Sequence, residues 1–181
     1  GTLRVGFYIE AATMDPHLSG SKVDRQIYHN IYEPLVVLDV KLGLKPGLAE
    51  SWQQPDAKTV IFKLRRGVKF HDGTPFVARH VLSSWLRVLD PKAKSGRGEP
   101  LYPIIGAREY AQGTGKRLDG VAVRDDSTVV VTLKEPNAIF PKLLAMPVAS
   151  IAPDNIPANF GEKPVGTGPW KLVEWKHDDY L

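Results

Sequence analysis

Apolar and polar residues alternate in several short stretches of the chain, and this period of two predicts β-strands. In residues 59–64 the apolar side chains Val60, Phe62 and Leu64 share one face. Polar residues at 125–127 separate two such stretches and predict a β-hairpin. The predicted strands cover residues 3–9, 35–38, 50–53, 59–64, 121–124, 128–134 and 170–175.

A spacing of four residues between apolar positions predicts a helix over residues 22–33. Ser21 has the pattern of an N-cap, with Asp24 three residues later as in a capping box. Pro34 ends this helix because proline cannot continue the hydrogen-bond ladder. The buried stripe of the helix consists of Val23, Ile27 and Ile31.

A second long helix is predicted before residue 90. Thr74 followed by Pro75 has the pattern of a cap and a first-turn proline, and the Asp90–Pro91 pair ends the helix. Its apolar stripe consists of Val77, Val81, Trp85 and Leu89. Shorter helices are predicted over residues 102–111 and 139–145.

Strands and helices are interspersed along the chain, which predicts an α/β or α+β class. A length of 181 residues is enough for one sizeable core or two small subdomains. No apolar run approaches the roughly 20 residues of a membrane-spanning helix. Gly1 leads directly into a predicted strand, so we expect any export signal to have been removed or never included. Leu181 follows no helix stop or polar tail, so we expect the final element to be cut.

The charge pattern adds little to this picture. The net charge is +4 with an estimated pI near 9.2, but the basic residues are scattered. The densest group, Lys63 to Lys69, alternates with apolar residues and indicates the solvated face of a strand rather than a phosphate-binding patch. The absence of cysteine excludes disulfides, thiolate metal sites and cysteine nucleophiles.

No catalytic constellation is apparent. His71–Asp72 precedes a glycine and indicates a turn, and none of the five histidines has the spacing of a metal site. Residues 166–169 read Gly-Thr-Gly-Pro, which predicts a tight strand entry rather than a phosphate loop. No G-x-S-x-G motif occurs. We therefore expect no cofactor and no metal.

Aromatic residues offer the best candidates for contact with a small molecule. Trp52, Trp85 and Trp170 lie in predicted strands or on a helix stripe, so core packing is their default. Tyr102 lies at a junction of loop and helix and is the better candidate for a surface cleft.

Five segments in a fixed order together resemble one protein family. They are MDPHL at 14–18, IYEPLV at 31–36, PGLAESW at 46–52, FKLRRGVKFHDGTPF at 62–76 and PVGTGPW at 164–170. The family is the bacterial extracellular solute-binding proteins of family 5, which includes the oligopeptide-, dipeptide- and nickel-binding proteins of ABC transporters. Val77 and His80 depart from the family pattern in a structural stretch.

The resemblance implies an α/β fold of the periplasmic-binding-protein-like class II type, of which this chain is a partial first lobe with an inserted mixed α/β subdomain. Residues 1–45 would begin the lobe core, residues 46–163 would form the inserted subdomain, and residues 164–181 would return to the core. The second lobe would be absent from this chain.

The resemblance further implies an extracytoplasmic binding protein that delivers a short peptide to the permease subunits of an ABC importer. It would lie in the periplasm or outside the cell, free or lipid-anchored in its full-length form. No enzymatic activity and no nucleic-acid partner are expected. The ligand-binding residues implied by position, with backbone groups prominent in the first loop, are Leu18, Ser19, Gly20, Ser21, Lys22, Tyr102 and Met146.

Other readings stay open at this point. The ligand could be a nickel chelate, a sugar or an opine instead of a peptide. A hydrolase acting on cell-wall peptides would need a nucleophile with a base in reach. A sensor ectodomain would need a membrane anchor or a fused signalling domain.

Overall fold

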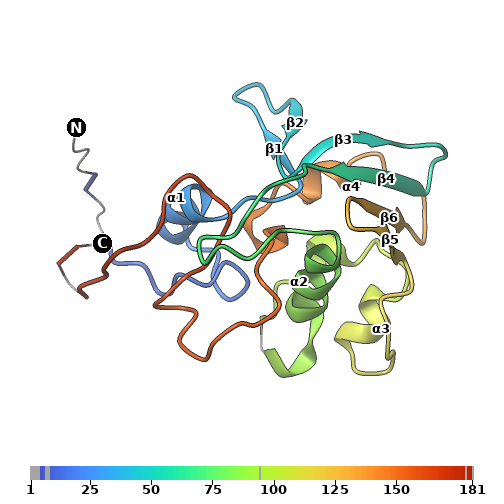
Figure 1. Cartoon of the computed structure of the whole chain (residues 1–181). Coiled ribbons are helices and arrows are strands. Elements are labelled where there is room, and N and C mark those ends of the chain that lie inside the picture. The colour runs from blue at the N-terminus through green and yellow to red at the C-terminus, as the bar shows by residue number, and fades with distance from the viewer. Residues whose placement is uncertain (1–4, 7–8, 94, 178, 181) are drawn as a thin grey trace.

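The computed structural model describes residues 5–6, 9–93, 95–177 and 179–180 (Figure 1). The strand predicted over residues 3–9 falls mostly outside these ranges. No helix in the described part of the chain combines the length and apolar character needed to span a bilayer. The elements are α1 (Lys22–Ile31), β1 (Val36–Leu38), β2 (Leu44–Pro46), β3 (Ala49–Gln53), β4 (Thr59–Leu64), α2 (Arg79–Leu89), η1 (Pro91–Ala93), η2 (Glu99–Leu101), α3 (Ala107–Ala111), β5 (Val121–Asp125), β6 (Thr128–Thr132), α4 (Phe140–Leu143) and η3 (Pro147–Ala149), where η marks a 3-10 helix.

A four-stranded antiparallel sheet with the order β3-β4-β6-β5 forms the main framework. The predicted alternation in β4 is confirmed, because Val60, Phe62 and Leu64 are all buried. The predicted hairpin is also confirmed, since β5 and β6 pair directly across the turn at 125–128. The short strands β1 and β2 form a separate hairpin that projects from the body of the molecule (Figure 1).

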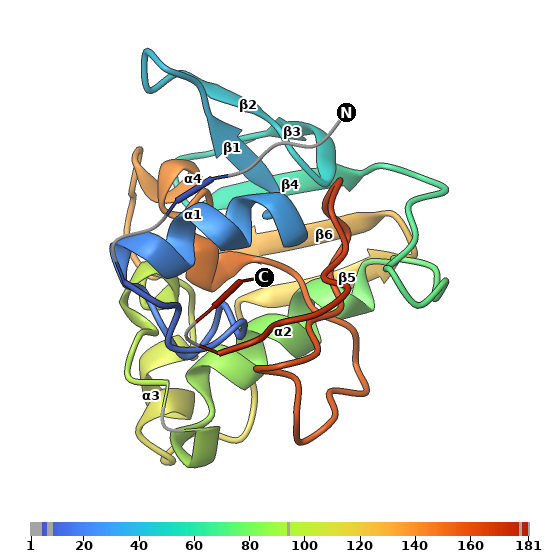
Figure 2. The ribbon, with the colours of Figure 1, turned by 90° about the vertical axis from the view of Figure 1, so that its left-hand side faces the viewer.

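The helix α2 packs on this sheet, and Figure 2 looks past α1 and α2 onto the strands behind them. Trp85 of α2 is fully buried, as predicted from its position on the apolar stripe. The helix ends before Pro91, as predicted, but its predicted start at Thr74 is wrong. Residues 69–76 form a turn instead, in which Pro75 pairs with Lys69 and the Phe70 N–H donates to the Thr74 carbonyl at 2.9 Å.

The helix α1 begins where its cap was predicted. The Ser21 hydroxyl accepts a hydrogen bond from the Asp24 N–H at 3.1 Å. The reciprocal half of a capping box is missing, because the Asp24 carboxylate accepts from the Ala12 N–H and the Ser19 hydroxyl. The helix ends at Ile31, two residues before the prediction, because residues that precede a proline favour extended backbone.

Two further predictions of secondary structure are wrong. Residues 102–111 do not form one helix, because Gly106 adopts a left-handed backbone with φ of +82° and α3 begins only after it. Residues 170–175 form no strand, and Trp170 is 61% exposed rather than part of the core. Residues 139–145 do contain the predicted short helix, as α4.

The buried apolar residues form two clusters. The larger one joins the sheet to α2 and includes Phe62, Trp85 and Phe140. The smaller one lies around α1 and includes Tyr32 and Phe160. The division of the chain at residues 45 and 163 stays a prediction.

Candidate functional site

The loop that precedes α1 is held in place by hydrogen bonds from several directions. The Tyr28 hydroxyl donates to the Thr13 carbonyl at 2.8 Å, and the Tyr32 hydroxyl donates to the Met14 carbonyl at 2.9 Å. The Met14 N–H donates to the Gly161 carbonyl at 2.7 Å. Burial raises the pKa of both tyrosine hydroxyls, so they remain protonated donors at physiological pH.

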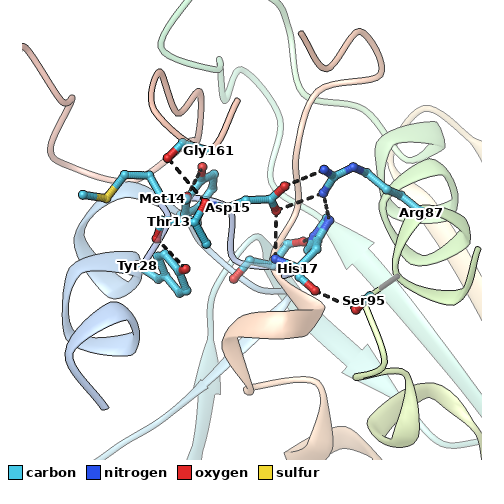
Figure 3. A network of polar contacts seen from close by, with 10 residues as sticks. Thr13, Met14, Asp15, His17, Tyr28, Arg87, Ser95 and Gly161 are labelled. Carbon is cyan, nitrogen blue, oxygen red and sulfur yellow. Dashed lines mark hydrogen bonds and ion pairs between the residues drawn. The ribbon is translucent and has the colours of Figure 1, made fainter. Parts of the chain in front are cut away.

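Asp15 and Arg87 form the charged centre of the network that anchors this loop (Figure 3). The Asp15 side chain is only 2% exposed, and both its oxygens accept from the guanidinium of Arg87, at 3.0 and 2.5 Å. One of these oxygens also accepts from the His17 N–H at 3.0 Å. A bidentate pair of this kind fixes orientation as well as distance, so α2 sets the position of the loop.

His17 connects this pair to a third segment. The guanidinium of Arg87 can only donate, so His17 Nδ1 accepts from it at 2.8 Å and the ring proton lies on Nε2. His17 Nε2 donates to the Ser150 carbonyl at 2.9 Å. Burial is the main cause that lowers the pKa of His17 to about 4, and the ring is therefore neutral at physiological pH.

The same network reaches the segment that contains Tyr102. The Ser95 hydroxyl donates to the His17 carbonyl at 2.6 Å (Figure 3). Three residues later, Gly98 packs so closely on the Tyr102 ring that an added Cβ would lie 3.0 Å from it. Tyr102 itself is half-buried, and the guanidinium of Arg108 lies 4.6 Å from the centre of its ring.

The predicted ligand residues therefore come from three segments that meet at the Asp15–His17 anchor. Leu18, Ser19, Gly20, Ser21 and Lys22 follow His17 directly, and Leu18, Ser21 and Lys22 are exposed. Tyr102 follows the segment bonded through Ser95. Met146, which is 37% exposed, precedes η3 and the Ser150 carbonyl that His17 contacts. No hydrogen bond, ion pair or ring contact joins the side chains of Ser21, Tyr102 and Met146 in the described part of the chain.

Several residues at this site escaped the sequence analysis. His17 was grouped with histidines that lack metal spacing, and Asp15 and Arg87 were assigned no role. The only local signal was the Met14–Leu18 motif, which marks the loop as unusual. Arg87 lies 72 residues from Asp15 in sequence, so nothing local pairs the two.

Two other features have different roles. His71 Nε2 donates to the Gly168 carbonyl at 2.8 Å and Nδ1 accepts from the Gly166 N–H, so this histidine ties two chain segments together. Asp72 caps the turn as predicted, by accepting from the Thr74 N–H. No cluster of acidic and histidine side chains suited to a metal occurs among residues that the structure describes.

A groove of about 960 Å³ lies between α1 and residues 170–180. It is lined by exposed apolar side chains, including Ile9, Trp170 and Val173. None of the seven predicted ligand residues lines it. The groove and the predicted site are therefore distinct surfaces.

Comparison with known proteins identifies the group to which this fold belongs. Residues 43–181 match the family model of bacterial extracellular solute-binding proteins, family 5 Middle. The chain is 37% identical to the periplasmic oligopeptide-binding protein OppA of Escherichia coli K12 over 92% of its own length and 32% of that protein. It is 36% identical to the dipeptide-binding protein DppE of Bacillus subtilis 168 over 95% of its length and 33% of DppE.

Solved structures agree with the sequence matches. The substrate-binding domain of an oligopeptide ABC transporter from Bacillus anthracis superposes with a TM-score of 0.85 at 31% identity, over 91% of this chain and 34% of that one. Haemophilus influenzae OppA in complex with RPPGFSPFR superposes with a TM-score of 0.83 at 28% identity, over 91% and 34%. The fold is thus that of OppA-type periplasmic binding proteins, and the chain spans about a third of the length of these relatives. This chain belongs to family 5 of the bacterial extracellular solute-binding proteins.

Proposed function

We propose that this chain forms one wall of the ligand cleft of an extracytoplasmic binding protein, and that the ligand is a short peptide delivered to an ABC importer. The relatives named for oligopeptide and dipeptide binding support a peptide ligand. So does the solved complex of Haemophilus influenzae OppA with RPPGFSPFR. The permease subunits of the importer are the proposed partners, and the periplasm or the outer face of the cell membrane is the proposed location.

One observation in this chain carries the proposal. In the described part of the structure, the backbone N–H and C=O groups of Ser19 and Gly20 form no hydrogen bond within the protein. Both residues are half-buried, in a loop anchored on one side by His17 and on the other by the cap of α1. Unpaired peptide groups at a fixed position can pair with the backbone of an extended ligand, as an added strand pairs with a sheet edge.

The side chains around this loop suit a site that accepts peptides of many different sequences. Backbone pairing is the same for every residue of a peptide, so it does not select by sequence. The adaptable thioether of Met146 and the ring of Tyr102 would supply apolar contacts. Ser21 and Lys22 are exposed beside this loop, and the backbone groups of Ser21 already pair with Ser19 Oγ and with the Arg25 N–H.

The proposed lobe organisation of the full-length protein is taken from its relatives. Residues 1–45 and 164–181 are proposed to belong to the core of the first lobe, and residues 46–163 to its inserted subdomain. A second lobe, carried by the remaining length of such proteins, would close over the peptide and signal the loaded state. The proposed function is binding alone, so a bound peptide should be recovered chemically intact.

Native mass spectrometry of the full-length protein as purified tests the ligand class directly. We expect intact short peptides to be released on denaturation. Isothermal titration should then show that trialanine binds. Methylation of the amide nitrogen of its middle residue should weaken binding about tenfold, since one net hydrogen bond is lost. Equal binding of the methylated peptide, or hydrolysis of the ligand, would contradict the proposal.

An opine is the second candidate ligand. AgaA, a binding protein solved in complex with agropinic acid, is 32% identical to this chain and superposes with a TM-score of 0.77. Agropinic acid in the purified protein, with no binding of trialanine, would favour this alternative.

A further inference from the structure

Arg97 is presented by a short loop of constrained shape. It lies between Gly96, whose φ of +60° is in the left-handed region, and Gly98, which packs on the ring of Tyr102. Ser95 anchors the start of this loop on the His17 carbonyl at 2.6 Å. The left-handed backbone at Gly96 and the close packing at Gly98 each favour glycine, so both glycines suit this conformation of the loop.

The guanidinium of Arg97 lies directly against the backbone of Gly20. A Cβ at position 20 would overlap the Nη2 and Cζ atoms of Arg97. The backbone of Gly20 is not left-handed, so glycine is needed here for space rather than for conformation. The arginine head and the unpaired peptide groups of Ser19 and Gly20 thus lie side by side.

No acidic side chain forms an ion pair with this cation within the described part of the protein. Arg97 forms no ion pair or hydrogen bond there, and its Nε is buried without a partner. Arg87, by contrast, is satisfied by two contacts to Asp15. A guanidinium that is half-buried and unpaired is costly, and a planar acid group satisfies it best, because two parallel N–H groups match two carboxylate oxygens.

We infer that Arg97 is a specificity-determining residue that binds a carboxylate of the ligand beside the Ser19–Gly20 backbone. The carboxylate is either the C-terminus of the peptide or an acidic side chain. This inference rests on the proposed peptide-binding function. It adds a charge preference to a site whose central contacts are the backbone groups of Ser19 and Gly20.

Two pairs of peptides distinguish the sources of the carboxylate. Trialanine and its C-terminal amide differ in the terminal charge, and the amides of Ala-Glu-Ala and Ala-Gln-Ala differ in the side-chain charge. In isothermal titrations with the full-length protein, we expect the charged member of one pair to bind about 10- to 100-fold more tightly. The preference should decrease as salt is added.

Three variants then test the role of Arg97. Arg97→Gln should abolish the preference, so that the charged and neutral members of each pair bind with similar affinity. Gly20→Ala should reduce the preference because its methyl group displaces the guanidinium. Arg124→Gln removes the same charge from exposed β5 and is the matched control, which should retain the preference.

The outcomes separate the inference from the function. Peptide binding with the charge preference intact in Arg97→Gln would overturn the role of Arg97 alone. So would a wild-type protein that binds both members of each pair equally. Failure of all four peptides to bind the wild type would overturn the proposed function together with this inference.

Discussion

At the scale of single residues, the anchor beneath the candidate site depends on one buried carboxylate. Asp15 is almost inaccessible to water, and burial of such a charge is tolerable only when it is paired and fully hydrogen-bonded. The fork of Arg87 and the N–H of His17 meet that requirement. Arg87 also stacks 5.6 Å from the centre of the Phe160 ring, which links the charge to the apolar cluster around α1.

His17 makes this anchor sensitive to acid. Because its folded pKa of about 4 lies below the ordinary value of 6.5, the unfolded chain takes up a proton first as pH falls. The neutral ring contributes fully to the free energy of unfolding above pH 6.5. This contribution is lost as the pH falls from 6.5 towards 4. The loss amounts to about 2–3 kcal/mol near pH 4.5.

The variant His17→Gln isolates this effect, since its amide can still donate to the Ser150 carbonyl but does not titrate. Urea unfolding at about pH 7 and about pH 4.5 should show that the variant loses about 2–3 kcal/mol less than the wild type. An equal loss in both proteins would mean that His17 is not the acid-sensitive group.

At the scale of elements, α1 connects the ligand loop to the protein. Its cap, Ser21, was predicted from the sequence, and the structure confirms the bond to the Asp24 N–H. The same residue was also predicted to meet the ligand. These two roles separate experimentally if the ligand contact involves only the backbone.

We expect Ser21→Ala to lower the free energy of unfolding by about 1 kcal/mol, since the cap is lost. Ser21→Asp should retain the stability because an aspartate caps equally well. Both variants should bind peptide within about twofold of the wild type, since neither change removes a backbone group of Ser19 or Gly20. A large loss of affinity in both would show instead that the hydroxyl itself contacts the ligand.

Much of the secondary structure could be predicted because its signals are local. The cap at Ser21, the alternation in β4 and the hairpin of β5 and β6 each depend on residues only a few positions apart. The start of α2 could not be predicted, because Thr74 and Pro75 belong to a turn in which Pro75 pairs with Lys69. The same pair of residues suits either arrangement, and packing decides between them.

At the scale of the whole molecule, residues 166–168 connect the two apolar clusters. The Gly168 N–H donates to the Ile31 carbonyl at 2.9 Å, and the Gly166 carbonyl accepts from the His71 N–H at 2.9 Å. A Cβ at Gly168 would lie 2.5 Å from the carbonyl oxygen of Asn30. The glycine allows two backbones to approach more closely than any side chain would permit.

Gly168→Ala should therefore cost about 1–3 kcal/mol of unfolding free energy, because the end of α1 would have to move. The matched control is Gly161→Ala, whose Cβ would meet only the side chain of Thr13, and a side chain can rotate away. Urea denaturation of both variants measures the difference. Equal stability of the two variants would show that the C-terminal end of α1 can move at little cost in free energy.

The sequence alone determined the family resemblance and most of the strands, and the seven ligand residues stay a prediction. Only the tertiary structure decided that Arg87 neutralises Asp15, that His17 reaches Ser150 across 133 residues of sequence, and that Arg97 lies on Gly20. Periodicity and capping act within about four residues, so a sequence reveals them directly. Which distant segments meet depends on how all the buried faces pack together, and no local pattern records that.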